Sequence, residues 1–176
     1  MNNETKQFID TSTVQVPPNY VLIDGALWGI DLKKAKRTNT AYRSLYRGKM
    51  AESLAKSAPY LFAVEAGSEF EKWIRKLDPV ERRVAWLHSS ANLDELRKHL
   101  RQFLRMKKED GGKIYFRFYD PLVLTTVLPH LTEEQRKAFF KQINYIEMED
   151  KKIHERVKYS LTEDYELIIK KEDLCG

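Results

Sequence analysis

The chain has 176 residues, of which 42% are hydrophobic and 11% aromatic, so it can fold as one domain around a hydrophobic core. No apolar run approaches the roughly 20 residues of a membrane span, and the first residues lack the cationic start and apolar core of a signal peptide. The 31 basic and 26 acidic residues give a net charge of +5 and a mixed surface, not a polycation. The sequence therefore predicts a cytoplasmic protein that does not enter the membrane.

The first half of the chain predicts strands that alternate with helices. Residues 1–18 are polar and end in two prolines, which predicts a flexible N-terminal segment. A helix begins at Gly67-Ser68, carries apolar residues at helical spacing and ends at Asp78-Pro79. The other predicted elements before it are strands at 20–24 and 59–65 and weaker helices at 30–37 and 49–57.

A buried strand and a long capped helix are predicted next. Residues 82–88 form a near-continuous apolar run, which is typical of a strand covered on both faces. Asn92 is a preferred helix N-cap, and Glu95 stands three residues later, at the spacing of a capping box. The apolar spacing extends this helix to about Lys108, and residues 109–112 predict a turn.

Residues 113–119 alternate strictly, with Phe116 and Phe118 on one face and Arg117 and Tyr119 on the other. This period of two predicts a strand with one buried face. The strand then stops at Asp120-Pro121, which predicts a helix start, because aspartate is a preferred N-cap and proline suits the first helical position.

The C-terminal third predicts two more helices and a hairpin. The helix from Pro121 is interrupted at Pro129, and Thr132 with Gln135 forms a second capping box. Charge rises from Tyr145 onward, although 156–159 and 165–169 can pair as a hairpin. We therefore expect an α/β or α+β fold, with helices on a mainly parallel central sheet that the hairpin makes mixed. The expected parts are a flexible segment (1–18), an α/β domain (19–145) and a C-terminal extension (146–176).

No arrangement of residues predicts catalysis, a cofactor or a metal site. The one cysteine, Cys175, stands beside the C-terminal glycine, where nothing positions a base for it. No pair of histidines has a metal-ligand spacing, so structural roles are expected for His88 and His99. Ser89 and Ser90 lack the surroundings of a hydrolase nucleophile and are better explained as turn residues before a helix. The glycines form neither a phosphate-binding loop nor a dinucleotide fingerprint.

Two sets of charged residues remain as candidates for binding or structure. Arg97, Arg101 and Arg105 stand opposite the apolar stripe of their predicted helix. Three interpretations of these arginines stay open: a solvated helix face, a docking surface for an acidic or mixed protein partner, and a surface that binds nucleic acid. Arg117 lies between two tyrosines, close to Asp120, and we expect a buried ion pair that holds the strand-to-helix corner, with direct partner contact as the alternative.

Four stretches of the chain together resemble a known bacterial family. They are Tyr20-Val-Leu-Ile-Asp-Gly-Ala26, Ala58-Pro-Tyr-Leu61, Trp86-Leu-His-Ser-Ser90 with the helix carrying His99-Leu-Arg101, and Phe116-Arg-Phe-Tyr-Asp-Pro121 followed by Leu128-Pro129. Over residues 19–145 the chain is similar to the adaptors, or effector chaperones, of type VI secretion systems. The resemblance implies a protein without catalysis that binds an effector toxin and the VgrG spike protein. Many members carry a further C-terminal lobe, which raises the question of whether this chain engages both partners.

The resemblance and the residues together favour a non-catalytic adaptor that loads cargo for secretion. We expect Trp28 and Tyr46 to be exposed anchors for the partner, because both stand in a cationic, polar stretch, although core positions are the alternative. Arg117, Tyr119, Asp120 and Pro121 belong to the family motif, for which we expect a structural role. The competing hypothesis is a basic nucleic-acid-binding module, and a hydrolase using Ser89 or Ser90 is a third.

Overall fold

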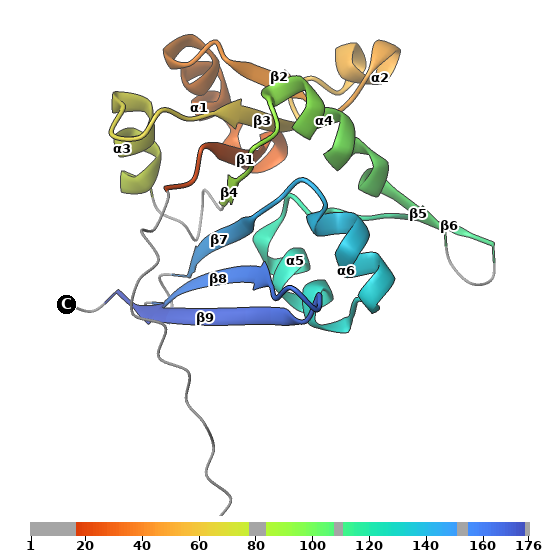
Figure 1. Ribbon diagram of the computed structural model, residues 1–176. Coiled ribbons are helices and arrows are strands. Elements are labelled where there is room, and N and C mark those ends of the chain that lie inside the picture. Colours follow the sequence, from red (N-terminus) through yellow and green to blue (C-terminus); the bar gives the residue numbers. More distant parts are fainter. Residues whose placement is uncertain (1–16, 78–83, 108–110, 151–154, 175–176) are drawn as a thin grey trace, which may run out of the picture.

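The computed structural model describes residues 17–77, 84–107, 111–150 and 155–174 (Figure 1). The chain forms a seven-stranded sheet and a separate two-stranded ribbon, with helices packed around the sheet. The sheet has the order β2 (Tyr42–Ser44), β3 (Pro59–Ala63), β1 (Tyr20–Asp24), β4 (Val84–His88), β7 (Tyr145–Asp150), β8 (Glu155–Leu161) and β9 (Leu167–Asp173). The ribbon pairs β5 (Arg105–Lys107) with β6 (Lys113–Tyr115) and projects from the body beyond α4.

The expectation of a mainly parallel sheet is wrong, because every strand pairing in the described residues is antiparallel. Strand β1 lies between β3 and β4 and runs opposite to both. The segment between β1 and β3 contains α1, β2 and α2, which together return the chain beside β1. Helix α1 connects β1 to β2 across β3, and α3 connects β3 to β4 across β1. Each of these helices joins two strands that run in the same direction, but an antiparallel strand lies between the two.

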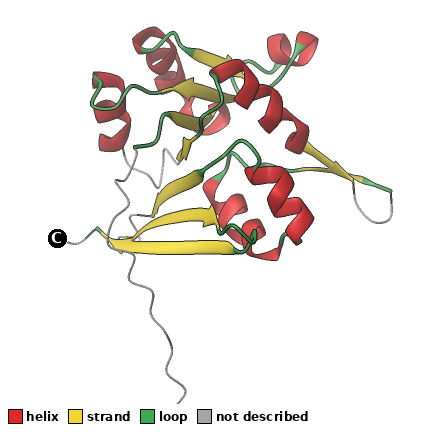
Figure 2. Cartoon of the chain, in the orientation of Figure 1, coloured by secondary structure: helices red, strands yellow, loops and turns green. Residues whose placement is uncertain are grey.

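Helices α3 to α6 begin where their capping residues predict, whereas the helix expected over 30–37 begins earlier, at Gly25. Figure 2 shows the distribution of the helices around the strands. Ser68 caps α3, Asn92 with Glu95 forms the capping box of α4, and Thr132 with Gln135 forms that of α6. Asp120 accepts from the backbone N–H of Leu122 at 3.1 Å and caps α5. The bounds are α1 (Gly25–Thr38), α2 (Gly48–Ser53), α3 (Glu69–Lys76), α4 (Leu93–Arg101), α5 (Pro121–Val127) and α6 (Glu133–Phe140).

Four predicted elements are shorter in the structure than in the sequence pattern. The helix expected over 49–57 ends at Ser53, and the strand expected over 59–65 ends at Ala63. The helix from Asn92 stops at Arg101 and continues as a 3-10 turn (Gln102–Leu104), so Arg105 lies in strand β5 and not in the helix. The strand expected over 113–119 ends at Tyr115 because Phe118 and Tyr119 both turn into buried positions ahead of the cap. The predicted helix end at Asp78-Pro79 and the flexible segment before Pro17 lie outside the described residues.

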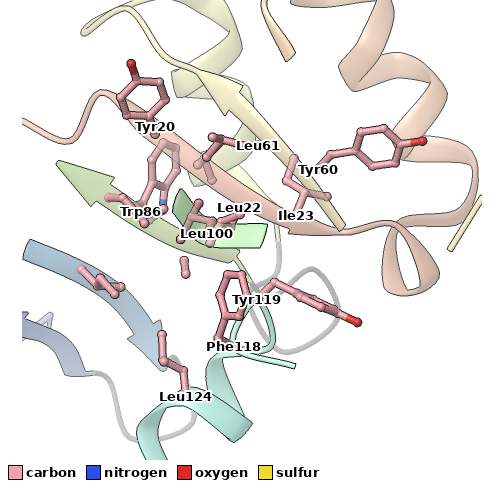
Figure 3. Packing of buried hydrophobic residues seen from close by; sticks show 14 of the residues in the cluster. Tyr20, Leu22, Ile23, Tyr60, Leu61, Trp86, Leu100, Phe118, Tyr119 and Leu124 are labelled. Atoms are coloured by element: carbon pink, nitrogen blue, oxygen red, sulfur yellow. The ribbon is translucent and has the colours of Figure 1, made fainter. Parts of the chain in front are cut away.

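The C-terminal strands belong to the same sheet as the N-terminal ones. Strand β7, which the sequence pattern did not predict, pairs with β4 on one side and β8 on the other. The predicted hairpin is confirmed as β8 and β9. Side chains from β1, β3 and β4 meet those of α4 and the Phe118–Leu124 segment in one core (Figure 3).

Candidate interaction surface

The exposed anchors expected from the sequence are buried. Trp28 has no exposed surface and packs edge-on against Trp73, with the ring centroids 6.0 Å apart. Tyr46 is 8% exposed. The alternative of core positions therefore holds for both residues. Helix α1 breaks at Gly29, directly after Trp28, with a φ of 48°, so the tryptophan points inward and Ile30 is 79% exposed.

Two arginines of α4 are fixed against the segment between β2 and α2. Arg97 donates from Nε to the carbonyl oxygen of Ser44 at 2.7 Å and from Nη2 to that of Tyr46 at 3.2 Å. Arg101 donates from Nε to the carbonyl of Leu45 at 2.8 Å. These bonds satisfy three consecutive carbonyl groups, that of Ser44 at the end of β2 and those of the two residues after it. They also hold two guanidinium groups in defined positions on the surface.

Arg43 and Arg47 extend this cationic region, and we call Arg43, Arg47, Arg97 and Arg101 the arginine patch. Arg43 binds both carboxylate oxygens of Asp94, at 2.7 and 3.0 Å. Burial lowers the pKa of Arg97 and of Arg101, and the positive charge of Arg47 lowers the pKa of each further. Arg97 is therefore repelled by Arg43 and Arg47, and Arg101 is repelled by Arg47 and Arg97.

A cluster of tyrosines adjoins the arginine patch. The rings of Tyr46 and Tyr115 meet edge to face, with centroids 6.4 Å apart, and Tyr115 is 40% exposed. Burial and hydrogen bonding with Tyr46 raise the pKa of Tyr115 well above its usual range, and burial raises that of Tyr119. Arg105 lies directly opposite Tyr115 in the ribbon. Residues so placed in an antiparallel pair are within side-chain contact range, so the ribbon continues the surface.

Arg117 pairs more closely with Asp24 than with Asp120, the partner that the sequence suggested. Its Nη2 lies 2.6 Å from Oδ2 of Asp24 and 3.9 Å from Oδ2 of Asp120. Asp24 is 1% exposed, whereas the Arg117 side chain is 46% exposed, so only the acid is buried. The guanidinium also lies 5.7 Å from the ring centroid of Tyr119. The expected ion pair therefore joins two segments distant in sequence, and Pro121 occupies the first position of α5 as predicted.

In the structure Arg97 contacts Tyr46 directly and Arg101 contacts the adjacent Leu45. Arg105 lies opposite Tyr115, whose ring meets that of Tyr46. Their role in partner binding stays a prediction. Sequence reasoning missed Arg43 and Arg47, although both belong to the cationic stretch around Tyr46. The cationic stretch was the signal that could have identified these two arginines, but the sequence does not indicate that α4 lies against that stretch.

The residues considered for other chemistry are used structurally in the described part of the chain. The Ser89 hydroxyl donates to the carbonyl of Gln142, and its side chain is buried. His88 stacks on Tyr145 with an interplanar angle of 9°. Among the described residues, no three histidine, cysteine, aspartate or glutamate side chains gather as metal ligands would. Within the same residues, no helix has the length and apolar character required to cross a membrane.

Comparison with known proteins places the chain in a family. Residues 19–138 match the family model described as "Domain of unknown function (DUF4123)", and the chain belongs to this family. The family is linked to type VI secretion. No curated protein and no solved structure matches the chain. The matched region contains all the residues of the arginine patch and the tyrosine cluster.

Proposed function

We propose that the protein is a non-catalytic adaptor of a type VI secretion system. It binds an effector toxin, the VgrG spike protein or both in the cytoplasm, and so loads cargo for secretion. The observation that carries this proposal is the family match over residues 19–138, because the family is linked to that process. The surface chemistry supports it: arginine and tyrosine side chains are frequent at the energetic centres of protein interfaces.

The arrangement of the surface suits binding to a polypeptide. Arg97 and Arg101 are held by backbone carbonyls, so their side chains lose little freedom when a partner arrives. Tyr115 offers a half-exposed ring beside them. Fixed cations would orient the partner and accelerate encounter, while the ring would contribute apolar contact area.

Affinity capture from the native bacterium tests this function. The tagged chain is purified in moderate salt with nuclease present, and captured proteins are identified by mass spectrometry. We expect a spike protein or a toxin-like polypeptide that is absent from a parallel capture with an unrelated basic protein of similar size. Recovery of neither would contradict the adaptor function.

Nucleic-acid binding is the second candidate, and the arginine patch is the observation that favours it. Phosphate contacts release counterions, so an affinity of this origin falls steeply as salt concentration rises. A titration of the chain with generic DNA and RNA at several salt concentrations measures this salt dependence of the affinity directly. Affinity in the range of ordinary non-specific binding, about 10⁻⁴ to 10⁻⁶ M at physiological salt, would assign no nucleic-acid function.

A further inference from the structure

The arginine patch carries positive charge that its surroundings do not neutralise. Asp94 is the carboxylate bound there, and Arg43 occupies both of its oxygens. Arg97 and Arg101 are held by carbonyl oxygens, which are neutral acceptors and leave the guanidinium charge in place. The side chain of Arg47 is exposed and makes no hydrogen bond or ion pair with any residue that the structure describes. An anionic partner would supply the missing counter-charge.

The patch also has free donors in fixed positions. Both Nη groups of Arg101 lack a hydrogen-bond partner among the described residues, while its Nε is anchored to Leu45. A guanidinium held at Nε presents its remaining N–H groups in a rigid fork, which matches the two oxygens of a carboxylate. The patch is therefore organised for anion recognition before any partner binds.

An amphipathic ring borders these donors. Tyr115 contacts Tyr46, whose carbonyl oxygen is bound by Arg97, so the ring and the guanidinium groups belong to one continuous surface. Arg105 stands opposite Tyr115 on the ribbon. A complementary partner carries several carboxylates and at least one apolar or aromatic side chain among them.

We propose that the arginine patch and Tyr115 form the docking site for an acidic polypeptide segment that contains an aromatic or apolar residue. This inference rests on the proposed adaptor function and names the chemistry of its partner. Tyr46 and Tyr119 are buried, so Tyr115 is the ring of the tyrosine cluster that is open to a partner, whereas single-stranded nucleic acid stacks successive bases on successive rings.

Charge reversal at Arg47 tests the inference without removing a contact of the fold. The variants are Arg47→Glu, Arg47→Lys and, as a control with the same change of charge on exposed helix surface, Lys33→Glu in α1. Binding is measured by fluorescence anisotropy with a labelled glutamate-rich peptide that contains one phenylalanine. The same peptide with glutamine in place of glutamate, and an oligothymidylate of equal charge, are the comparison probes.

We expect the wild-type chain and the Lys33→Glu variant to bind the glutamate peptide equally, and Arg47→Lys to bind nearly as well. Arg47→Glu should bind it at least about tenfold more weakly, and the glutamine peptide should bind none of the chains. Equal binding by Arg47→Glu and wild type overturns the inference, as does failure of the wild type to bind the glutamate peptide at low salt. Tighter binding of oligothymidylate, lost in Arg47→Glu, assigns the patch to nucleic acid and also overturns it.

Failure of this inference is distinguishable from failure of the adaptor function. The capture experiment is repeated with the Arg47→Glu and Lys33→Glu variants. If all three chains recover the same secretion proteins in equal yield, the adaptor function holds and the docking site lies elsewhere. If the wild type recovers none of them, the adaptor function fails, whatever the peptide measurement shows. Loss from Arg47→Glu alone supports both.

Discussion

Asp24 connects three parts of the structure through one carboxylate. Its Oδ1 accepts from the backbone N–H of Ala26 at 2.9 Å and caps α1, while its Oδ2 binds Arg117 at 2.6 Å. Because Asp24 is buried, its charge depends on these partners. At the next residue, a Cβ on Gly25 would lie 2.5 Å from the carbonyl oxygen of Ala58, so only glycine fits there.

Replacement of Arg117 by alanine should destabilise the protein by about 2 kcal/mol, because Asp24 is left buried with only its cap hydrogen bond. The exposed position of Arg117 keeps the loss below that of a fully buried pair. The double variant Arg117→Ala/Asp24→Asn should recover part of the loss, since asparagine preserves the cap without a charge. Urea denaturation measures the stability of the wild type, of Arg117→Ala and of the double variant. If the double variant is no more stable than Arg117→Ala, the buried charge of Asp24 is not the cause of the destabilisation.

His99 makes stability depend on pH. Its Nε2 lies 2.8 Å from the carbonyl oxygen of Phe139, which can only accept, so this nitrogen carries the proton of a neutral ring. Burial lowers the pKa of His99, and Lys141 lowers it further. The unfolded chain binds a proton at its ordinary pKa of about 6.5, and the folded chain does so only at lower pH. The free energy of unfolding should therefore fall as pH decreases below about 6.5.

Denaturation at pH 7 and pH 5 checks this dependence on three chains. The His99→Gln variant should lose less stability than wild type over this interval, whatever its stability at pH 7. The exposed His130 provides the control, and His130→Gln should keep the wild-type dependence. If the wild type and His99→Gln lose the same amount, the acid sensitivity has another origin.

At the scale of elements, the sequence predicts best those that begin with a local chemical signal. The caps at Asn92, Thr132 and Asp120 predict three helix starts correctly, because each cap involves residues only two or three positions apart. Strands β2 and β7 were not predicted. β2 has only three residues, and β7 alternates charged with apolar residues in a charge-rich region, so both depend on their neighbours in the sheet.

Arg75 connects α3 to the sheet. It binds Glu71 of its own helix at 2.8 Å, lies 3.6 and 3.4 Å from Glu147 and Glu149 of β7, and covers the ring of Trp86 at 4.1 Å. Substitution by methionine should cost about 2 kcal/mol, because three partly buried carboxylates then lose a shared cation.

A second ion pair of α3 supplies the control for Arg75. Lys72 binds Glu69 at 2.8 Å, but both side chains are mostly exposed, so Lys72→Met should leave the denaturation midpoint unchanged. On the same helix, Lys72→Met removes one exposed ion pair, whereas Arg75→Met removes three ion pairs with partly buried carboxylates. Equal midpoints for Arg75→Met and Lys72→Met would show that the contacts with β7 contribute nothing.

For the molecule as a whole, the order of the strands in the sheet could not be predicted from the sequence. Alternating strands and helices favour parallel strands, and nothing local indicates that β1 lies between β3 and β4. The same limit applies to the candidate site. Arg97 and Arg101 were recognised as a cationic face, but the approach of Arg43 and Arg47 requires α4 to lie across the segment after β2, which is a tertiary arrangement.

A chain that ends after Asn144 should fail to fold stably. It retains the family-matched region but lacks β7, one of the two partners of β4, and five buried side chains, those of Tyr145, Ile146, Met148, Val157 and Tyr159. Burial of each contributes about 1.5–3 kcal/mol, and the sum is comparable with the 5–15 kcal/mol by which domains are stable. Thermal unfolding followed by circular dichroism should show no cooperative transition. A chain that ends after Leu161 is the control and should melt cooperatively; cooperative melting of the shorter chain would identify residues 146–176 as an independent extension.

The position of β4 has a consequence for biosynthesis. Its inner edge can pair with β1 as soon as residue 88 leaves the ribosome, but its other edge pairs with β7, which begins at Tyr145. Residues 89–144 take roughly 3 to 10 s to translate at about 5–20 residues per second. During that interval the apolar strand Val84–His88 has an open edge, which is a site for unwanted strand pairing. The nascent chain is therefore most vulnerable to aggregation between the emergence of β4 and the emergence of β7.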